Sequence, residues 1–433
     1  MGSLYEKSDD YVLPEATAPS LVLAHPTDDE KRQTWTLNHK EWGGGLSLQE
    51  YLDRENFLTT IPLSGHGGMS YWVLTDSSWV PANEKETRPV LASCESIRKR
   101  VLVASPGDTE ARSGIGHGVG SVFTYPKHRG YRYAGRMLNE LGPVLRSWQS
   151  KEPDNRDVVC SALWSDIGKT YYAKKGWAAF PSSHVEFPIP PADQMRGGGE
   201  ADEKITPITY DNLEQLCKDD EKLVCAQVVR TARKTGRTTI AFAPDHDTLR
   251  WHLYRDEFIA SRLLKKSPAP TPDGKLIPTI KGAIAGTKNG RRVWALWSRN
   301  YSGASGAPAD TVDKNTLYIL RLVIEPEATG SDSDDAEKIS HEDDILAAFT
   351  AVMHTAQREA AAWHLGKIDL WNPSPAVAKL IESCGLTHRW VHRDVDSIPS
   401  MMWYGGGGGG GDKEKKEDGQ DIEWVANEKY CWC

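Results

Sequence analysis

Long hydrophobic runs are absent from this chain of 433 residues. No apolar stretch approaches the roughly 20 residues that a helix needs to span a bilayer. The first ten residues are too acidic for a secretory or transit peptide, and Glu6 stands where N-myristoylation requires Ser or Thr. The sequence therefore predicts a cytoplasmic protein without a membrane segment.

Paired cysteines and an excess of positive charge are also missing. The seven cysteines are odd in number and scattered, with no Cys-x-x-Cys spacing, which predicts reduced thiols. Nothing in the sequence indicates a metal. A net charge of −8 argues against nucleic acid as a partner and permits a cationic substrate.

The chain is longer than one ordinary hydrophobic core, so we predict two domains. A hydrophobic content of 39%, with 16 Trp, is enough to bury both. Glycines and charged residues mark a linker and a later disordered loop. The predicted parts are a first domain at 1–190, a linker at 191–204, a second domain at 205–404, a disordered loop at 405–421 and an aromatic strand at 422–433 that returns to the body.

Within the first domain, basic residues are concentrated between positions 122 and 138. An apolar run of β type leads into a turn that contains His128, Arg129 and Arg132, and an amphipathic segment with Arg136 follows. Such a turn presents backbone N–H groups, a helix N-terminus and cationic side chains to a phosphate. The segment predicts a site for an anionic cofactor; the alternative is an ordinary turn with a solvated cationic face.

A second motif follows at 157–177. Residues 157–164 are typical of a buried strand, and residues 165–177 of a helix that ends at Gly176. Upstream, the patterns predict strands at 20–24, 71–75 and 89–103. They also predict a helix at 27–42 that begins at Thr27.

The two motifs resemble those of the GNAT acetyltransferases. Arg129 and Ala134 match the ends of Arg/Gln-x-x-Gly-x-Gly/Ala, although Arg132 takes a place usually filled by Gly. Ser165, Tyr172 and the pair Gly176-Trp177 match the strand and helix motif that follows. The resemblance implies an α/β (α+β) GNAT fold, with a mixed central sheet flanked by helices and acetyl-CoA as co-substrate.

The resemblance also assigns a cofactor site. The backbone of residues 123–125 should pair with the pantetheine arm, and the backbone of residues 129–134 with the pyrophosphate. The predicted cofactor-binding residues are Phe123, Thr124, Tyr125, Arg129, Gly130, Tyr131, Arg132, Tyr133, Ala134 and Ser165.

Acetyl transfer requires a neutral amine and an acid for the leaving thiolate. An ammonium of pKa about 10.4 is only about 0.04% deprotonated at pH 7, so a base accelerates the reaction by several powers of ten. By motif match Tyr172 is the acid; the alternative is that it packs beside Tyr171.

Two residues are candidates for the base. Glu95 lies on a strand predicted to be largely buried, where a carboxylate needs a purpose or a partner. The alternative to a role as the base is that Glu95 forms a salt bridge to Arg98 or Arg100. His117, on the glycine-rich strand before the basic turn, is the other candidate, with a structural role as its alternative.

The second half repeats the order of the first. A strand at 316–324, a helix at 345–363, a strand at 367–371 and a helix at 375–383 predict a second, degenerate GNAT-like domain. The alternative is two ordinary β-α-β passages. Acidic residues replace the basic turn and would repel a pyrophosphate: Glu325, Glu327, Asp332, Asp334, Asp335 and Glu337.

The segments Ser93–Glu95, His128–Gly130 and Ala173–Trp177, with the long aromatic C-terminal half, resemble the fungal lysine N6-acetyltransferase family. This resemblance implies an N-acetyltransferase that acts on a small amine, with free L-lysine favoured. The residues leave open a protein, peptide or polyamine acetyltransferase and an inactive GNAT-like scaffold. They do not determine the oligomeric state.

Overall fold

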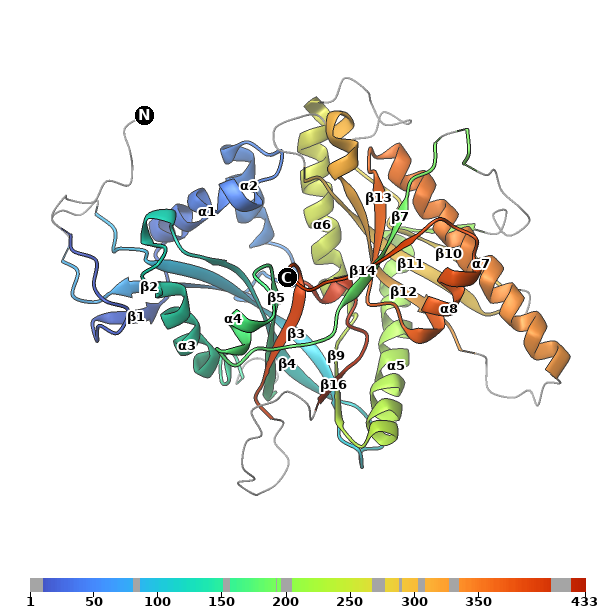
Figure 1. Cartoon of the computed structure of the whole chain (residues 1–433), viewed down its shortest axis with the longest axis horizontal. Coiled ribbons are helices and arrows are strands. Elements are labelled where there is room, and N and C mark those ends of the chain that lie inside the picture. The colour runs from blue at the N-terminus through green and yellow to red at the C-terminus, as the bar shows by residue number, and fades with distance from the viewer. Residues whose placement is uncertain are drawn as a thin grey trace.

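The computed structural model describes residues 11–80, 86–150, 156–191, 193–195, 205–266, 277–287, 290–302, 308–326, 335–405 and 422–433. Two mixed sheets stand side by side, and helices pack against each of them (Figure 1). The predicted fold class, α/β with mixed sheets flanked by helices, is confirmed. None of the helices in these ranges is both long and apolar enough to cross a membrane.

The first sheet has the order β1-β2-β3-β4-β5-β15-β6, and β9 bridges β3 and β16. Its strands are β1 (Leu21–Ala24), β2 (Met69–Asp76), β3 (Ala92–Ala104), β4 (Arg112–Phe123), β5 (Val158–Ser165), β6 (Ala178–Ala179), β9 (Thr238–Phe242), β15 (Ile398–Trp403) and β16 (Ile422–Trp424). The strands β4 and β5 are parallel, and α3 (Tyr133–Leu145) connects them and packs against the sheet. The apolar face of α3 forms one core with Leu74 and Cys94.

Two helices precede this sheet and begin at capping boxes. In α1 (Asp28–Trp42) the Thr27 side chain accepts from the backbone of Glu30, whose carboxylate accepts in return. Ser47 and Glu50 do the same for α2 (Leu48–Leu58). These reciprocal bonds satisfy orphan donors at each helix start. The prediction of the first helix is confirmed, whereas the second was not predicted.

The second sheet has the order β14-β7-β13-β12-β11-β10-β8. Its strands are β7 (Ser183–Pro188), β8 (Ile205–Ile208), β10 (Gly282–Gly286), β11 (Arg292–Asn300), β12 (Thr316–Ile324), β13 (Lys367–Trp371) and β14 (Arg389–His392). Its helices are α5 (Tyr210–Thr235), α6 (His246–Leu263), α7 (Asp335–Ala362) and α8 (Pro375–Ser383). The strands β12 and β13 are parallel and α7 connects them, so β10 to β13 repeat the order and directions of β2 to β5.

The two sheets exchange strands. The strand β7 lies at the end of the predicted first domain but pairs with β13 of the second sheet. The strand β15 comes from the predicted second domain but pairs with β5. From the second half, β9 also pairs with β3. The predicted limits at 190 and 205 therefore do not follow the sheets, because the pattern of a strand indicates its faces but not its partner. Most of the predicted linker, of the predicted loop at 405–421 and of the acidic run after Glu325 lies outside the described residues.

Residues 422–433 return to the body between the two sheets, although a strand covers only Ile422–Trp424. The Tyr430 side chain is fully buried, and its hydroxyl donates to the carbonyl of Phe242 at 2.7 Å. The Lys99 ammonium donates to the carbonyls of Cys431 and Trp432 at 2.9 and 2.8 Å. This segment is thus part of the folded core.

Tyr430→Phe should lower the melting temperature. The buried carbonyl of Phe242 would lose its donor, which costs about 1–3 kcal/mol, or several degrees for a chain of this size. Calorimetry checks this, with Tyr131→Phe as the control because the Tyr131 side chain is 45% exposed. Equal melting temperatures for the two variants would contradict the structural role of the bond.

Candidate active site

The basic turn between β4 and α3 forms an anion cradle. After a short 3-10 turn at Pro126–His128, Gly130 and Arg132 have φ of 90° and 67°. The helix α3 then begins, and its first backbone bond runs from the N–H of Arg136 to the carbonyl of Arg132. The three preceding amides, at 133–135, have no acceptor within the helix. Together with the helix dipole they favour a phosphate at this end.

Arg132 has the left-handed conformation that Gly ordinarily supplies at this place in the motif. A non-glycine residue there costs about 1–3 kcal/mol, and the Arg132 side chain remains exposed. Arg132 therefore keeps the backbone conformation that a glycine would have here, and its side chain adds a cation to the rim of the cradle.

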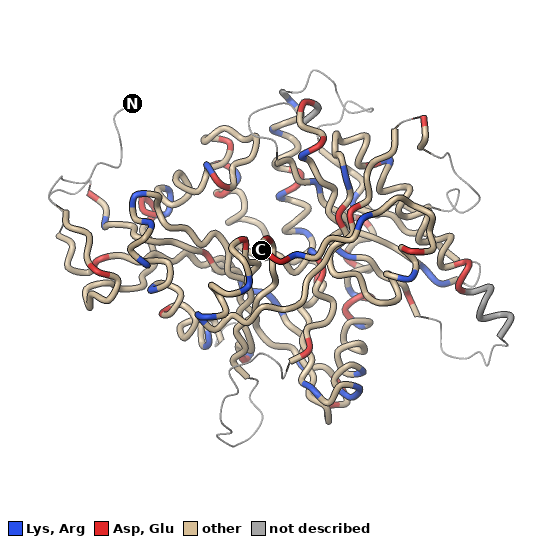
Figure 2. Tube along the Cα trace, in the orientation of Figure 1, with Lys and Arg blue, Asp and Glu red and all other residues tan. Residues whose placement is uncertain are grey.

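The basic side chains of the cradle differ in their partners, since Arg136 is bonded to Glu140 at 2.5 Å whereas Arg132 is exposed. The Arg129 side chain is 57% exposed and lies 3.5 Å from Glu41, with a second contact of 3.3 Å to the carbonyl of Thr124. Lys and Arg are interspersed with Asp and Glu over much of both halves (Figure 2). The His128 side chain does not join the cradle, because it is buried against the rings of Tyr125 and Tyr133.

The strands β4 and β5 separate next to the cradle. Their pairing ends at Gly118 and Ala162, although β4 continues to Phe123 and β5 to Ser165. The intervening backbone groups of β4 on that side are free of β5, which leaves a wedge between the strands. An extended ligand can pair with such an open strand edge. The predicted positions Phe123, Thr124 and Tyr125 lie at the mouth of this wedge.

Glu95 lies on β3 beside the wedge. It is opposite Gly120 of β4, and its carboxylate accepts a hydrogen bond of 2.7 Å from Ser121. Burial first, and then the nearby Glu55 carboxyl, raises the pKa of Glu95 to about 7. A carboxyl with this pKa accepts a proton near neutral pH.

The predicted alternative, a salt bridge from Glu95 to Arg98 or Arg100, is wrong. Both arginines are an odd number of residues away and so lie on the other face of β3. Arg100 pairs instead with Glu221 at 2.6 Å.

Glycines occupy alternate positions of β4 on the face of Glu95. A Cβ at Gly118 would lie 2.8 Å from the sulfur of Cys433, and one at Gly120 would lie 3.6 Å from a Glu95 oxygen. Side chains at these positions would displace the C-terminal segment. The glycines therefore let residues 431–433 approach the sheet beside Glu95.

His117 does not lie with Glu95. It is opposite Arg98, on the face of the sheet that α3 covers, and it is fully buried. Its Nε2 lies 3.1 Å from the carbonyl of Trp148, and burial lowers its pKa to about 4. This arrangement fits a structural role for His117, which was the alternative to its role as the base.

Tyr172 lies on the face opposite Glu95, in the core that contains Cys94 and Val119. Burial, and then Tyr171, raises the pKa of Tyr172 well above its ordinary value, so the hydroxyl stays protonated. Its ring meets the Tyr171 ring edge-on at 5.2 Å. Glu95 and Tyr172 thus lie on the two sides of the first sheet.

The helix that carries Tyr172 is shorter than predicted. Only Thr170–Ala173 is helical (α4), because the chain first turns at Gly168 with φ of 81°. The Ser165 hydroxyl donates to the carbonyl of Gly168 at 2.7 Å and is committed to this turn. The helix ends at Ala173 rather than at the predicted Gly176, which has φ of 99° and closes the turn that follows the helix.

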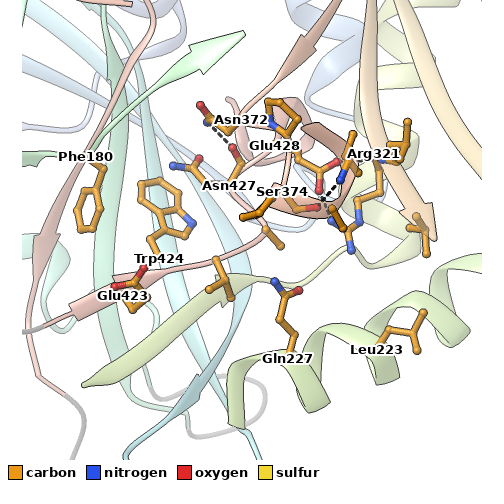
Figure 3. A pocket seen from close by; sticks show the side chains of 18 of the residues that line it. Phe180, Leu223, Gln227, Arg321, Asn372, Ser374, Glu423, Trp424, Asn427 and Glu428 are labelled. Carbon is orange, nitrogen blue, oxygen red and sulfur yellow. Dashed lines mark hydrogen bonds and ion pairs between the residues drawn. The ribbon is translucent and has the colours of Figure 1, made fainter. Parts of the chain in front are cut away.

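Two cavities lie between the halves. The larger, about 1020 Å³, lies between Trp424 and Phe180 on one side and Arg321 and Glu428 on the other (Figure 3). It contains none of the predicted site residues, and Arg321 is held by Asp220 at 2.8 Å.

The smaller cavity, about 290 Å³, lies where the ends of α1 and β5 meet α6 and the second sheet. No local pattern in the sequence predicted this cavity, because its residues come from eight separate segments. They include Glu41, Arg54, Asp166, Arg255, Lys429 and Trp432.

Among the described residues, His184, Glu186 and Asp369 are close enough to share a cation. The Lys367 ammonium already bonds Glu186 at 2.5 Å and lies 3.3 Å from Asp369. The group is therefore an ion-pair network around a lysine.

Comparisons with known proteins agree with the order of the elements. A family model described as the LYC1 GNAT-like C-terminal domain matches residues 184–433. The match begins within β7, the first strand of the second sheet in chain order, rather than at the predicted limit of 205. It ends after the segment that packs beside Glu95.

Two curated relatives cover much of the chain. A lysine acetyltransferase of Yarrowia lipolytica is 22% identical over an alignment of 448 residues that covers 94% of this chain and 98% of the relative. An uncharacterized protein of Saccharomyces cerevisiae is 28% identical over an alignment of 335 residues that covers 70% of this chain and 79% of the relative.

Solved structures are similar at lower identity. A probable N-acyltransferase of Enterococcus faecalis is 11% identical with a TM-score of 0.47, over 88% of this chain and 71% of that one. An N-myristoyltransferase of Saccharomyces cerevisiae with bound myristoyl-CoA is 10% identical with a TM-score of 0.47, over 92% and 82%.

Proposed function

Because the chain belongs to the family with the LYC1 GNAT-like C-terminal domain, we propose that it transfers the acetyl group of acetyl-CoA to the N6-amine of free L-lysine. It is an acyltransferase of the GNAT type. The acceptor in the proposal comes from the name of the Yarrowia lipolytica relative. The observation that carries the chemistry is the anion cradle at the start of α3, which leads into an open wedge beside a carboxyl of pKa about 7.

The chain supplies a place for each part of acetyl-CoA. In the proposal, the amides of residues 129–135 and the Arg129 guanidinium bind the pyrophosphate. The free edge of β4 at 123–125 pairs with the pantetheine arm, as a strand would. The thioester then lies in the wedge, with Glu95 on one side and Tyr172 on the other.

Two side chains then move the protons. Glu95 accepts a proton from the acceptor ammonium, and the neutral amine attacks the thioester carbonyl. As the C–S bond breaks, Tyr172 donates its proton to the leaving thiolate. The attacking nitrogen gives up its second proton, which restores the Tyr172 hydroxyl, and Glu95 releases its own proton to solvent. One N–C bond forms and one C–S bond breaks, so the products are the acetylated amine and free CoA thiol.

Arg129→Glu should weaken acetyl-CoA binding by about 10- to 100-fold. The change removes a charge-assisted bond and places a carboxylate beside the pyrophosphate, for a loss of about 1.5–3 kcal/mol. Calorimetry measures the affinity. Lys218→Glu, on the exposed face of α5, is the matched change of charge. Unaltered affinity in Arg129→Glu would remove the cradle from the cofactor site.

The function is tested by following thiol release from acetyl-CoA with lysine, ornithine, polyamines and histone-type peptides. We expect the fastest release with lysine and a product identified by fragmentation mass spectrometry as N6-acetyl-lysine. Release with peptides alone would replace the proposal by a protein acetyltransferase, and release with polyamines alone by a polyamine acetyltransferase.

A further inference from the structure

The smaller cavity contains a cation without a counter-charge. Arg255 lies on α6 and lines the cavity beside Arg54, with its guanidinium 5.7 Å from the ring of Trp432. No described residue forms a hydrogen bond or ion pair with the Arg255 side chain. Burial, and then the positive charge of Arg54, lowers the pKa of Arg255 to about 10.

The acids nearest to Arg255 are committed elsewhere. The Glu55 carboxylate accepts two bonds from Arg54, at 2.9 and 2.5 Å. Asp256, the next residue on α6, pairs with Arg299 at 2.9 Å and is 1% exposed. The two arginines therefore share one nearby carboxylate and leave an uncompensated positive charge at the wall of the cavity.

The cavity also contains charges that are not used up in ion pairs. Lys429 lies 4.0–4.5 Å from the ring centroids of Tyr318, Trp371 and Trp432, and burial lowers its pKa. The exposed Asp166 also lines the cavity, and its printed hydrogen bonds are those from the backbone and side chain of Ser397. A ligand with one carboxylate and one ammonium on the same carbon fits a wall that offers both an unpaired guanidinium and an exposed carboxylate. A guanidinium binds such a carboxylate through two parallel bonds.

We propose that Arg255, supported by Arg54, binds the α-carboxylate of an amino-acid acceptor in this cavity. The inference rests on the proposed function, because it names how the same site holds its acceptor. Glu95 is close enough for the Arg255 charge to act on its carboxyl. An extended lysine, with bonds of ~1.5 Å, separates its carboxylate from its N6-amine by about 7 Å. The side-chain amine would thus point from Arg255 toward Glu95.

The experiment compares lysine with 1,5-diaminopentane, which has the same chain and no carboxylate, in the full-length enzyme. Wild type should prefer lysine. Arg255→Gln should raise the KM for lysine about 10- to 100-fold, the range for one charge-assisted pair, and should leave the KM for the diamine unchanged. The lost charge also acts on Glu95, and that effect changes kcat equally for both substrates. Arg255→Lys should recover part of the loss. Lys218→Gln, a surface charge on α5, should change neither substrate.

A second measurement needs no variant. Lysinamide, whose carboxylate is replaced by a neutral amide, should have a KM raised by a similar factor in wild type. A KM for lysine unaffected by Arg255→Gln, or an equal rise in KM with lysine and the diamine, would overturn the role of Arg255 and leave lysine acetylation standing. A wild-type enzyme that does not acetylate lysine would overturn the proposed function, and this inference with it.

Discussion

Glu95→Gln should lower kcat at pH 7 by about 10²- to 10⁴-fold, the usual contribution of a general base. The change removes the proton acceptor and keeps the size of the side chain. Since the amide can still accept from Ser121, the fold and acetyl-CoA affinity should persist. Steady-state kinetics with lysine, together with the melting temperature, check the result.

The pH dependence of kcat/KM provides a second test of Glu95 as the base. Glu95 acts as a base only when deprotonated, and burial raises its pKa to about 7. The wild-type kcat/KM should therefore fall as pH drops below 7. This acid limb should be absent in Glu95→Gln, and the variant should recover partly at alkaline pH, where more acceptor amine is neutral.

Ser121→Ala is the matched control for the fall of kcat/KM at acid pH. The bond from Ser121 lowers the pKa of Glu95, so its loss should move the acid limb to higher pH while the maximum rate is largely kept. A loss of rate in Glu95→Gln that is uniform with pH, joined to a lower melting temperature, would reduce Glu95 to a structural role.

Tyr172→Phe should lower kcat by about 10²- to 10³-fold with near-normal acetyl-CoA affinity. The lost proton donor acts in the transition state, so its removal affects turnover rather than binding. Burial keeps the hydroxyl protonated at neutral pH, which makes it available to the thiolate. Calorimetry and single-turnover kinetics separate the two quantities.

Tyr171→Phe is the neighbouring control. Tyr171 is less buried, and its ring meets that of Tyr172 edge-on, a packing that a phenyl ring retains. Similar rates for wild type and Tyr172→Phe would leave Tyr172 as a packing residue and move the acid to another group or to water.

Much of the fold could be predicted where local signals are strong. The helix start at Thr27 follows from a reciprocal cap that the sequence itself contains. The helix at Pro375–Ser383 was predicted with its observed bounds, between a Ser cap and Gly385. The turn before α3 was predicted from its charge and its motif, down to the place where Arg132 substitutes for glycine.

Other features depend on which elements meet, and no local pattern contains that information. The face on which Glu95 or His117 lies depends on the register of β3 against β4, so the sequence left both as candidates for the base. Arg255 looked like one of many helical arginines. Its unpaired charge results from contacts of its neighbours. Glu55 bonds Arg54 within α2, and Asp256 pairs with Arg299 of β11.

The exchange of β7 and β15 also sets an order on biosynthesis. One edge of β5 pairs with β15, so this edge lacks its partner until Trp403 has been translated. At about 5–20 residues per second, the chain from Ser165 to Trp403 takes roughly 10 to 50 s to emerge. During that interval a nascent chain presents a buried-type strand with an open edge, which is prone to pair with other chains. A ribosome-bound first half is therefore the stage at which this protein most needs a chaperone.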